Sequence, residues 1–326
     1  MPEQFSLDII EDELLQLERG LLGILLFDRT SRKHIIWGTD DYAEYGAEYT
    51  AGHEIAEDLI TGRNGRIIQP RVLKAQTQKK DRTRARAEVF TPSWVCNEQN
   101  NLVDAQWFQG KDVFNRVKDQ SWETIHEPVP FPEKGLRSWK RYVDAKRMEI
   151  TCGEAPYLVS RYDTVTGKII PISDRIGLLD RKLRVVGENT EAEDDWKFWA
   201  RRAVESVYGY EFQGDNLLMA RENVLFTYIE YYRDRFGTEP EEKALKDIAL
   251  VISWNLWQMD GFNYAIPYCK VCNEPEQMTL FDFMDDDESF NYMRLQDTKG
   301  QQLCKIRDWR SKATIVFRNL VGGSQK

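Results

Sequence analysis

The chain has 326 residues and a formal net charge of −9, with 41% hydrophobic and 12% aromatic residues. This length suffices for one large α/β domain or two modest ones, and the hydrophobic content suffices for a core. No run of about 18 apolar residues occurs, so no membrane span is expected. The acidic N-terminus is unlike a secretory signal, and the five cysteines argue for a reducing compartment. These features predict a cytoplasmic protein without a disulfide scaffold.

Residues 63–86 are strongly basic, although the chain as a whole is acidic. Within them only Asp81 is acidic. The side chains that we expect to contact nucleic-acid phosphates are Lys74, Lys79, Lys80, Arg82, Arg84 and Arg86. The alternative is a solvated helix face, which is the commoner origin of a charge run.

Phe90, Thr91 and Pro92 form a short, distinctive motif. Pro92 restricts Thr91 to extended geometry, and Ser93 is expected to cap a helix over residues 94–103. An extended Phe-Thr-Pro before a helix can offer an aromatic face to a flat ligand, or it can be an ordinary corner. Residues 105–147 are expected to be a loop-rich connector.

A strand is predicted over residues 147–152, and it ends at a glycine turn, Cys152-Gly153. Gly153 would let a ligand approach the backbone closely. A helix is expected over residues 194–206. An apolar run at residues 21–27 followed by residues 34–37 predicts an opening hairpin, in which the first run is either strand or helix.

The segment around Glu211 has the pattern of a strand, a turn and a helix. Val207, Tyr208 and Tyr210 predict a short buried strand that ends at Glu211, and Gly214 then breaks the run before a long helix. Ligands of open parallel sheets bind beyond the carboxyl ends of the strands. Glu211 is therefore either an acceptor for both hydroxyls of a ribose or a solvated acid in a turn.

The C-terminal third is less regular. A helix is expected over about 239–247, an apolar run follows at residues 248–255, and Asp260 sits where regular structure gives way to a loop. Cys269, Cys272 and Cys304 could supply three zinc ligands, but structural zinc usually needs four, so free thiols are the alternative. A last strand is expected over residues 314–321.

Four segments in this order resemble the amino-group DNA methyltransferases, specifically the adenine-N6 enzymes of restriction–modification systems. Residues 88–92 are similar to the Phe-Thr-Pro motif of that family, and residues 149–155 are similar to its Asp-Pro-Ala-Cys-Gly-Ser-Gly loop. Residues 208–211 resemble the motif whose acid holds the ribose, and residues 255–261 resemble a segment whose acid lies near the adenine amino group. The resemblance covers about residues 85–262.

The resemblance implies an α/β fold with a Rossmann-like sheet, helices on both of its faces and an irregular N-terminal extension. The implied parts are an extension with a basic segment (1–84), a cofactor-binding core (85–268) and a loop-rich segment that completes the sheet (269–326). The implied cofactor is S-adenosyl-L-methionine (SAM), and the implied partners are DNA and a restriction or specificity subunit. The residues that the resemblance assigns to SAM are Phe90, Thr91, Pro92, Glu149, Cys152, Gly153, Glu211 and Asp260.

The chain departs from the family where the family has its catalytic tetrapeptide, Asn/Asp-Pro-Pro-Tyr/Phe, which holds a flipped base. The nearest match is Ala265-Ile266-Pro267-Tyr268, in which Asn263 could replace the missing polar residue. Glu154 also replaces a serine of the cofactor loop, and its charge could pair with the ammonium group of SAM. Two interpretations follow: a DNA adenine-N6 methyltransferase that uses Asn263, Pro267 and Tyr268, or a catalytically silent module that binds DNA or a restriction partner.

Overall fold

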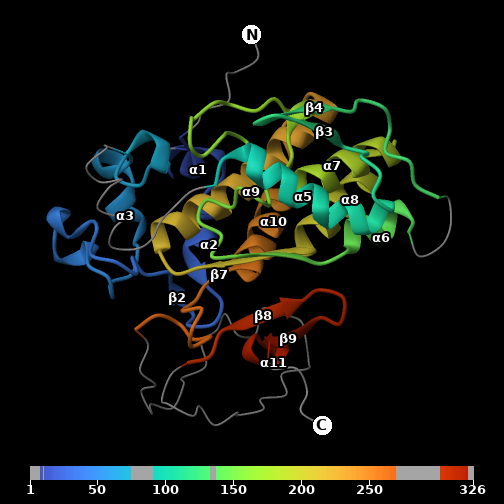
Figure 1. Ribbon diagram of the computed structural model, residues 1–326. Coiled ribbons are helices and arrows are strands. Elements are labelled where there is room, and N and C mark those ends of the chain that lie inside the picture. The colour runs from blue at the N-terminus through green and yellow to red at the C-terminus, as the bar shows by residue number, and fades with distance from the viewer. Residues whose placement is uncertain (1–7, 10, 75–90, 133–136, 269–301, 322–326) are drawn as a thin grey trace.

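The computed structural model describes residues 8, 9, 11–74, 91–132, 137–268 and 302–321, and it shows a mixed α/β chain (Figure 1). Its central element is a parallel three-stranded sheet of β5 (Arg147–Ile150), β6 (Val207–Glu211) and β7 (Leu256–Gln258), in the order β5-β6-β7. Glu149 pairs with Gly209, and Gly209 pairs with Leu256. Because the strands are parallel, their carboxyl ends meet at one edge of the sheet.

Helical crossovers connect the three strands, as parallel neighbours require. The first crossover contains α7 (Leu178–Asn189) and α8 (Glu193–Glu205), and the second contains α9 (Gly214–Phe236) and α10 (Glu242–Asn255). The three strands thus follow one another in both chain and sheet order.

The two faces of the sheet pack against different elements. Val207 and Leu256 belong to the main hydrophobic core with the long helices. Tyr208 and Trp257 belong to a second cluster that includes Ile306 of the C-terminal hairpin, made of β8 (Lys305–Asp308) and β9 (Ala313–Val316). The short α11 (Arg318–Val321) follows β9 on this second side (Figure 1).

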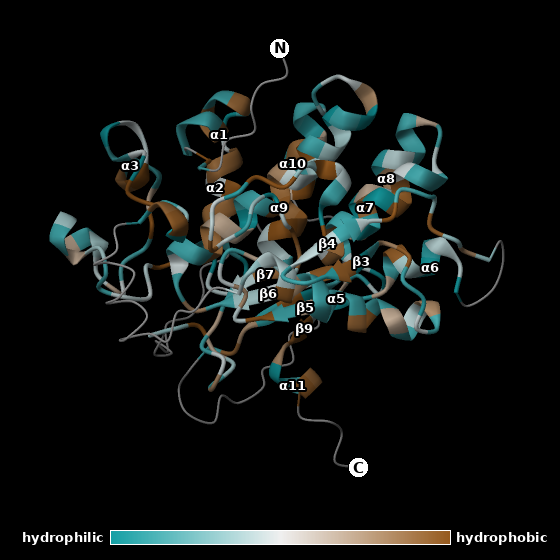
Figure 2. Cartoon of the chain, turned by 45° about the horizontal axis from the view of Figure 1, so that its top comes forward, coloured by the Kyte–Doolittle hydropathy of each residue, from teal (hydrophilic) through white to brown (hydrophobic). Residues whose placement is uncertain are grey.

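The N-terminal region packs into the main core. It contains α1 (Glu11–Leu17), α2 (Leu21–Leu26), a two-residue ladder of β1 (Phe27–Asp28) with β2 (Lys33–His34), and α3 (Glu57–Ile60). Four 3-10 turns, η1 (Ala43–Tyr45), η2 (Ala47–Tyr49), η3 (Gly62–Asn64) and η4 (Arg71–Leu73), complete it. Hydrophobic residues gather on α2 and α10 beside the sheet (Figure 2), and the four leucines of α2 are buried.

Four elements of the described chain come between the N-terminal region and β5 in the sequence. They are α5 (Ser93–Phe108), the antiparallel pair β3 (Asn115–Lys118) and β4 (Ser121–Thr124), and α6 (Trp139–Asp144). The 3-10 turn η5 (Ile172–Asp174) precedes α7. Within the described residues, no helix combines the length and the hydrophobicity that crossing a lipid bilayer requires.

The structure confirms several sequence predictions and corrects others. The strands at 147 and 207, the helices that begin near 93, 194 and 215, and the opening hairpin are present. The run at residues 21–27 is mainly helical, and residues 105–147 contain β3, β4 and α6 rather than loops alone. Ser93 does not cap α5: Pro92 occupies the N-cap position, and the Ser93 N–H donates to Asp163 over 2.8 Å.

The C-terminal prediction also differs from the structure. The expected strand over residues 314–321 is the shorter β9, after which the chain turns into α11. Among the described residues β9 pairs with β8 and not with the parallel sheet, so this segment covers a face of the sheet instead of extending it.

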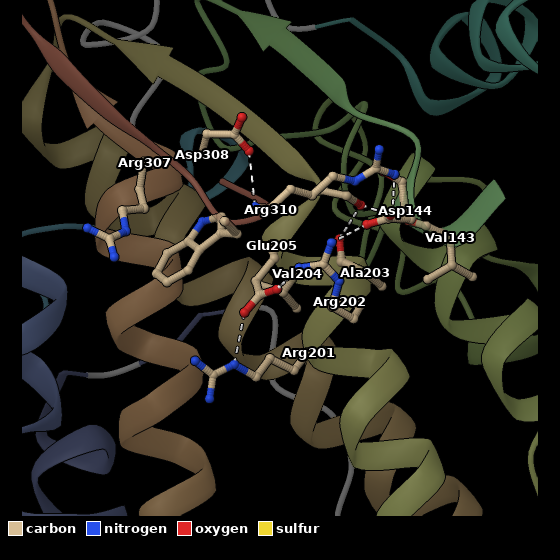
Figure 3. Close-up of polar contacts among 12 residues, drawn as sticks. Val143, Asp144, Arg201, Arg202, Ala203, Val204, Glu205, Arg307, Asp308 and Arg310 are labelled. Atoms are coloured by element: carbon tan, nitrogen blue, oxygen red, sulfur yellow. Dashed lines mark hydrogen bonds and ion pairs between the residues drawn. The ribbon is translucent and has the colours of Figure 1, made fainter. Parts of the chain in front are cut away.

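An ion-pair network holds the C-terminal hairpin near the amino ends of the strands (Figure 3). Asp144, at the end of α6, accepts from Arg202 of α8 and from Arg310 of the hairpin. Burial alone would raise the pKa of Asp144, but the hydrogen bonds from Arg310 and Arg202 lower it below its ordinary value. Lys146 adds an ion pair of 3.2 Å with Asp308. The network therefore joins α6, α8 and the hairpin.

Two glycines provide a matched test of how closely the start of α9 packs against the N-terminal region. A Cβ at Gly214, the first residue of α9, would lie 2.0 Å from the Ile36 carbonyl oxygen, whereas a Cβ at Gly187 in α7 would meet nothing within 4 Å. We expect Gly214→Ala to lower the free energy of unfolding by about 1–3 kcal/mol through overpacking. Gly187→Ala should raise it by about 0.5–1 kcal/mol through helix propensity. Urea unfolding of both variants checks this, and a destabilised Gly187→Ala or a neutral Gly214→Ala would contradict the packing described.

Candidate functional site

The turn after β5 is built from left-handed backbone conformations. Thr151, Gly153 and Ala155 have φ values of 48°, 52° and 64°. The turn is tied to the sheet by a 2.9 Å hydrogen bond from the Cys152 N–H to the Tyr210 carbonyl. It is tied again by a 2.8 Å hydrogen bond from the Gly153 N–H to Oε2 of Glu211. Two segments 58 residues apart in sequence therefore meet at the carboxyl edge of the sheet.

Glu211 is a buried acceptor rather than a solvated acid. Its Oε1 accepts from the N–H groups of Phe212 (2.9 Å) and Gln213 (3.1 Å), and 7% of the residue is exposed. Burial raises the pKa of Glu211 above its ordinary value, although the backbone N–H donors partly oppose the rise. A carboxylate has about four lone-pair positions. With three of them used, Glu211 retains the capacity to accept from about one ribose hydroxyl, not two.

Glu149 is a second buried carboxyl group near the same edge. Its oxygens accept from the N–H groups of Tyr157 (3.3 Å) and Leu158 (3.1 Å). Burial, with a smaller contribution from the negative charge of Glu211, raises the pKa of Glu149 to about 8 against the opposing effect of the two N–H donors. Glu149 thus fixes the loop that follows the Cys152-Gly153 turn. Cys152 itself is a buried free thiol.

The end of β7 supplies the third part of the edge. The Met259 N–H donates to the Glu211 carbonyl over 3.0 Å, and Asp260 follows directly. The Asp260 carboxylate accepts from the Phe262 N–H (2.9 Å) and from Nδ2 of Asn263 (2.6 Å). Asp260 therefore orients the Asn263 amide.

The remaining catalytic candidates lie in the same loop. Pro267 is buried, and the Tyr268 hydroxyl donates to the Gly38 carbonyl over 3.0 Å. The Tyr268 ring lies 6.0 Å from the ring of Phe212, the residue after Glu211. The structure thus brings the loop with Asn263, Pro267 and Tyr268 to the strand edge that carries Glu211.

The Phe-Thr-Pro motif is only partly within the described residues, because Phe90 lies outside them. Thr91 accepts through its carbonyl from Oγ1 of Thr164 over 3.1 Å. Pro92 precedes α5, whose first N–H is satisfied by Asp163. Thr91 and Pro92 therefore pack against the loop that Glu149 fixes.

The basic residues expected to contact phosphates divide into two groups. Lys74 is buried, its Nζ lies 3.1 Å from Oδ2 of Asp215, and it lies 5.7 Å from the centroid of the Tyr42 ring. Its charge therefore faces the start of α9 rather than solvent. The other five, Lys79, Lys80, Arg82, Arg84 and Arg86, lie outside the described residues.

The structure contradicts the expectation that Glu154 is free to pair with an ammonium group. Its carboxylate is buried and accepts from the Arg71 N–H (2.7 Å) and from the Tyr162 hydroxyl (2.7 Å). Asn223 of α9 donates to the Glu154 carbonyl over 3.1 Å. These partners lie at 71, 162 and 223, so no local pattern in the sequence could have identified them.

Gln258 is another residue that no sequence pattern pointed to. It is buried at the end of β7, its Nε2 donates to the carbonyls of Ile36 and Phe212, each over 2.8 Å, and its Oε1 accepts from the Ile36 N–H. Gln258 therefore joins the N-terminal region to the segment after Glu211.

Metal binding receives no support from the described residues. Cys304 is buried and its Sγ lies 3.4 Å from the Gln258 carbonyl, while Cys269 and Cys272 lie outside the described residues. In the part of the chain that is described, no three Cys, His, Asp or Glu side chains are placed to hold a metal ion.

No protein-family model, curated protein or solved structure matches this chain. The geometry alone therefore defines the candidate site. It is an edge at which a glycine turn, a buried carboxylate and an Asp-oriented amide meet, and such an edge can accept hydrogen bonds from a hydroxyl and from an amine.

Glu149 gives a pH-dependent test of this edge. Its pKa of about 8 in the folded chain exceeds the ordinary value of 4.5, so the folded state binds more protons between these values. The contribution of Glu149 to stability is therefore full below about pH 4.5 and is lost as the pH rises to about 8. We expect Glu149→Gln to gain stability relative to the wild type across this range, by at most about 1.4 kcal/mol per pH unit.

Urea unfolding from pH 5 to pH 9 measures this difference, with exposed Glu123→Gln as the control. The glutamine amide can cost some stability at every pH, so the readout is the change in the difference with pH. Parallel profiles for the wild type and Glu149→Gln would show that Glu149 is not a buried neutral acid at this edge.

Proposed function

We propose that the carboxyl edge of the β5-β6-β7 sheet binds SAM and that the chain is a DNA adenine-N6 methyltransferase. The observation that carries the proposal is the 2.8 Å hydrogen bond between the Gly153 N–H and Glu211, which joins two of the motif-like segments. The third motif-like segment contains Asp260, which follows β7, the strand that pairs with Glu211. Segments that resemble cofactor-binding motifs in sequence order are thus neighbours in space.

The residues at the edge fit the nucleoside part of SAM. Gly153 has φ of 52° and carries no side chain, so a ligand can approach the backbone there. Three backbone N–H groups use three acceptor positions of the Glu211 carboxylate, so one position remains for a ribose hydroxyl. Asp260 lies just after the carboxyl end of the neighbouring strand, β7.

The catalytic part of the proposal concerns Asn263 and Tyr268. When bound, SAM supplies an electrophilic methyl carbon: a bond forms to the adenine N6, the carbon–sulfur bond breaks with its electron pair left on sulfur, and one N6 proton passes to water. The Asn263 amide is held through its Nδ2 by Asp260, so its Oδ1 is available in this arrangement to accept from the adenine amine. The Tyr268 ring is half exposed beside Phe212 and offers a stacking surface for a flipped base.

A catalytically silent module is the second candidate. It is favoured by a specific observation, namely that the loop from Asn263 to Tyr268 lacks the family's polar-Pro-Pro-aromatic order and holds the Tyr268 hydroxyl on Gly38. In this candidate the edge binds SAM or its demethylated product without transferring the methyl group, and the chain recruits DNA or a restriction partner.

Titration calorimetry with SAM and with its demethylated product tests cofactor binding. We expect binding by the wild type, and a loss of about 10- to 100-fold in affinity for Glu211→Ala, because a charged acceptor contributes about 1.5–3 kcal/mol. Glu211→Gln keeps the shape and one acceptor oxygen, so it separates a binding effect from a folding effect. Exposed Glu123→Ala is the matched control and should bind like the wild type. Absence of binding by a folded wild type rejects the proposal. Wild-type affinity in both Glu211 variants rejects it as well.

Transfer of a tritiated methyl group to mixed genomic DNA separates the two candidates. If the chain is the enzyme, we expect the wild type to label DNA and Asn263→Ala to label it at least about 100-fold more slowly. Loss of a positioned transition-state hydrogen-bonding group lowers the rate by about this factor. Binding of SAM without any labelling would identify the silent module.

A further inference from the structure

A cavity between the N-terminal segment and α9 is lined by three acids. Asp8, Glu11 and Glu222 lie around it with Tyr162 and Asn223, and apolar side chains complete the wall. The empty space is about 230 Å³ with its open mouth, but only about 10 Å³ can hold the centre of a water molecule. The cavity therefore has room for about one ordered water.

Two of the acids are buried and have oxygens without a hydrogen-bond partner. Glu11 is 1% exposed and Glu222 is 2% exposed. Among the described residues, no donor contacts Oε2 of Glu11 or Oε1 of Glu222. An ionised carboxylate in such a position is costly, so it either takes up a proton or gains a cation.

The charges around the cavity do not neutralise the pair. Asp8 and Asp12 add negative charge near Glu11, and Glu13 lies close to Asp8. Arg66 opposes Asp8, and Arg161 opposes Glu222. The Arg161 guanidinium is held by Glu230 at 2.8 Å and by Asn223 at 3.2 Å.

The pKa values of both acids move in the direction that neutral carboxyls require. Burial, with smaller contributions from the charges of Asp8 and Asp12, raises the pKa of Glu11 to about 8. Burial also raises the pKa of Glu222 well above its ordinary value, and the charge of Glu11 is the next cause. Each acid therefore disfavours ionisation of the other.

We propose that Glu11 and Glu222 form a proton-operated clasp that holds α1 against α9. While both carboxyls are protonated, α1 stays in place and Leu14 remains buried. As the pH rises, the pair loses protons, the negative charges repel each other, and α1 separates from α9.

The clasp is connected to the candidate site through Asn223, which follows Glu222 in α9. Asn223 donates to the Glu154 carbonyl over 3.1 Å, and Tyr162 of the cavity wall donates to the Glu154 carboxylate. Release of α1 therefore exposes one side of Asn223 and Tyr162. These two side chains bond Glu154, which follows the Cys152-Gly153 turn. The clasp does not depend on methyl transfer, since its evidence is confined to α1, α9 and the cavity.

The proton balance sets the pH range. The Glu11 pKa in the folded chain is about 8 against an ordinary 4.5, so stabilisation of the closed clasp is full below about pH 4.5 and is lost as the pH rises to about 8. Within this range the opening equilibrium increases up to about tenfold per pH unit for each proton released.

Hydrogen exchange of the α1 amides, expressed as protection factors at several pH values from 5.5 to 9, tests the clasp. In the wild type we expect the protection factors to fall with rising pH below pH 8, by up to about tenfold per pH unit for each of the two protons released. In the double variant Glu11→Gln/Glu222→Gln they should stay level, because an amide pair has no proton to lose. The single variants Glu11→Gln and Glu222→Gln should each reduce the slope.

Glu13→Gln, an exposed position on the same helix, is the control and should keep the wild-type slope. Circular dichroism checks that each variant is folded. A wild-type slope of zero, or a wild-type slope in the double variant, overturns the proposal. If potassium or calcium restores protection at pH 9 in the wild type and not in the double variant, the cavity is a cation site and the clasp is likewise rejected.

Discussion

The hydrogen bonds that Glu211 accepts from three backbone N–H groups are the interaction on which the rest of the candidate site depends. They fix the Gly153 turn after β5 and the first residues after β6 to one carboxylate. A buried N–H group without an acceptor costs about 1–3 kcal/mol. Removing this acid would therefore loosen the turn, the strand end and the start of α9 together. Any ligand at this edge meets an acid that is already structural, and its binding must use the acceptor position that remains.

The same solution recurs through the chain, which buries acids against backbone donors and arginines. Glu149 accepts from two N–H groups, Glu154 from Arg71 and Tyr162, and Glu230 pairs with Arg161 and Arg175. The net charge of −9 is thus not only a property of the surface. Burial raises the pKa of Glu149. At Glu230 burial is outweighed by the charges and hydrogen bonds of Arg161 and Arg175, which lower the pKa. The two acids therefore make stability depend on pH in opposite directions. Glu11 and Glu222 are the extreme case, since within the described part of the chain each has a carboxylate oxygen without a donor.

The parts of the fold that could be predicted from sequence are those with local signals. The run Val207, Tyr208 and Tyr210 followed by Gly214 predicted β6 and the start of α9, and both are present. The run at 21–27 is short and wholly apolar, so periodicity could not distinguish a helix from a strand. Lys74 appeared as one of a row of surface cations, yet its partner Asp215 is 141 residues away. Ser93 failed as a cap because it is the first residue of α5, and its own N–H donates to Asp163, 70 residues away.

The proposed cofactor binding and the proposed catalysis rest on different parts of the candidate site. The binding side is rigid, since Gly153, Glu211 and the end of β7 are joined by hydrogen bonds to buried atoms. The catalytic side is a loop whose backbone reverses at Tyr264 and Tyr268, each with φ of 58°. The side-chain groups of Asn263 and Tyr268 bond within the loop or to Gly38 rather than to the sheet. Substitutions in that loop can therefore alter the chemistry without disturbing the strand edge. For this reason the missing catalytic tetrapeptide weakens the inference of methyl transfer more than it weakens the inference of a nucleoside-binding edge.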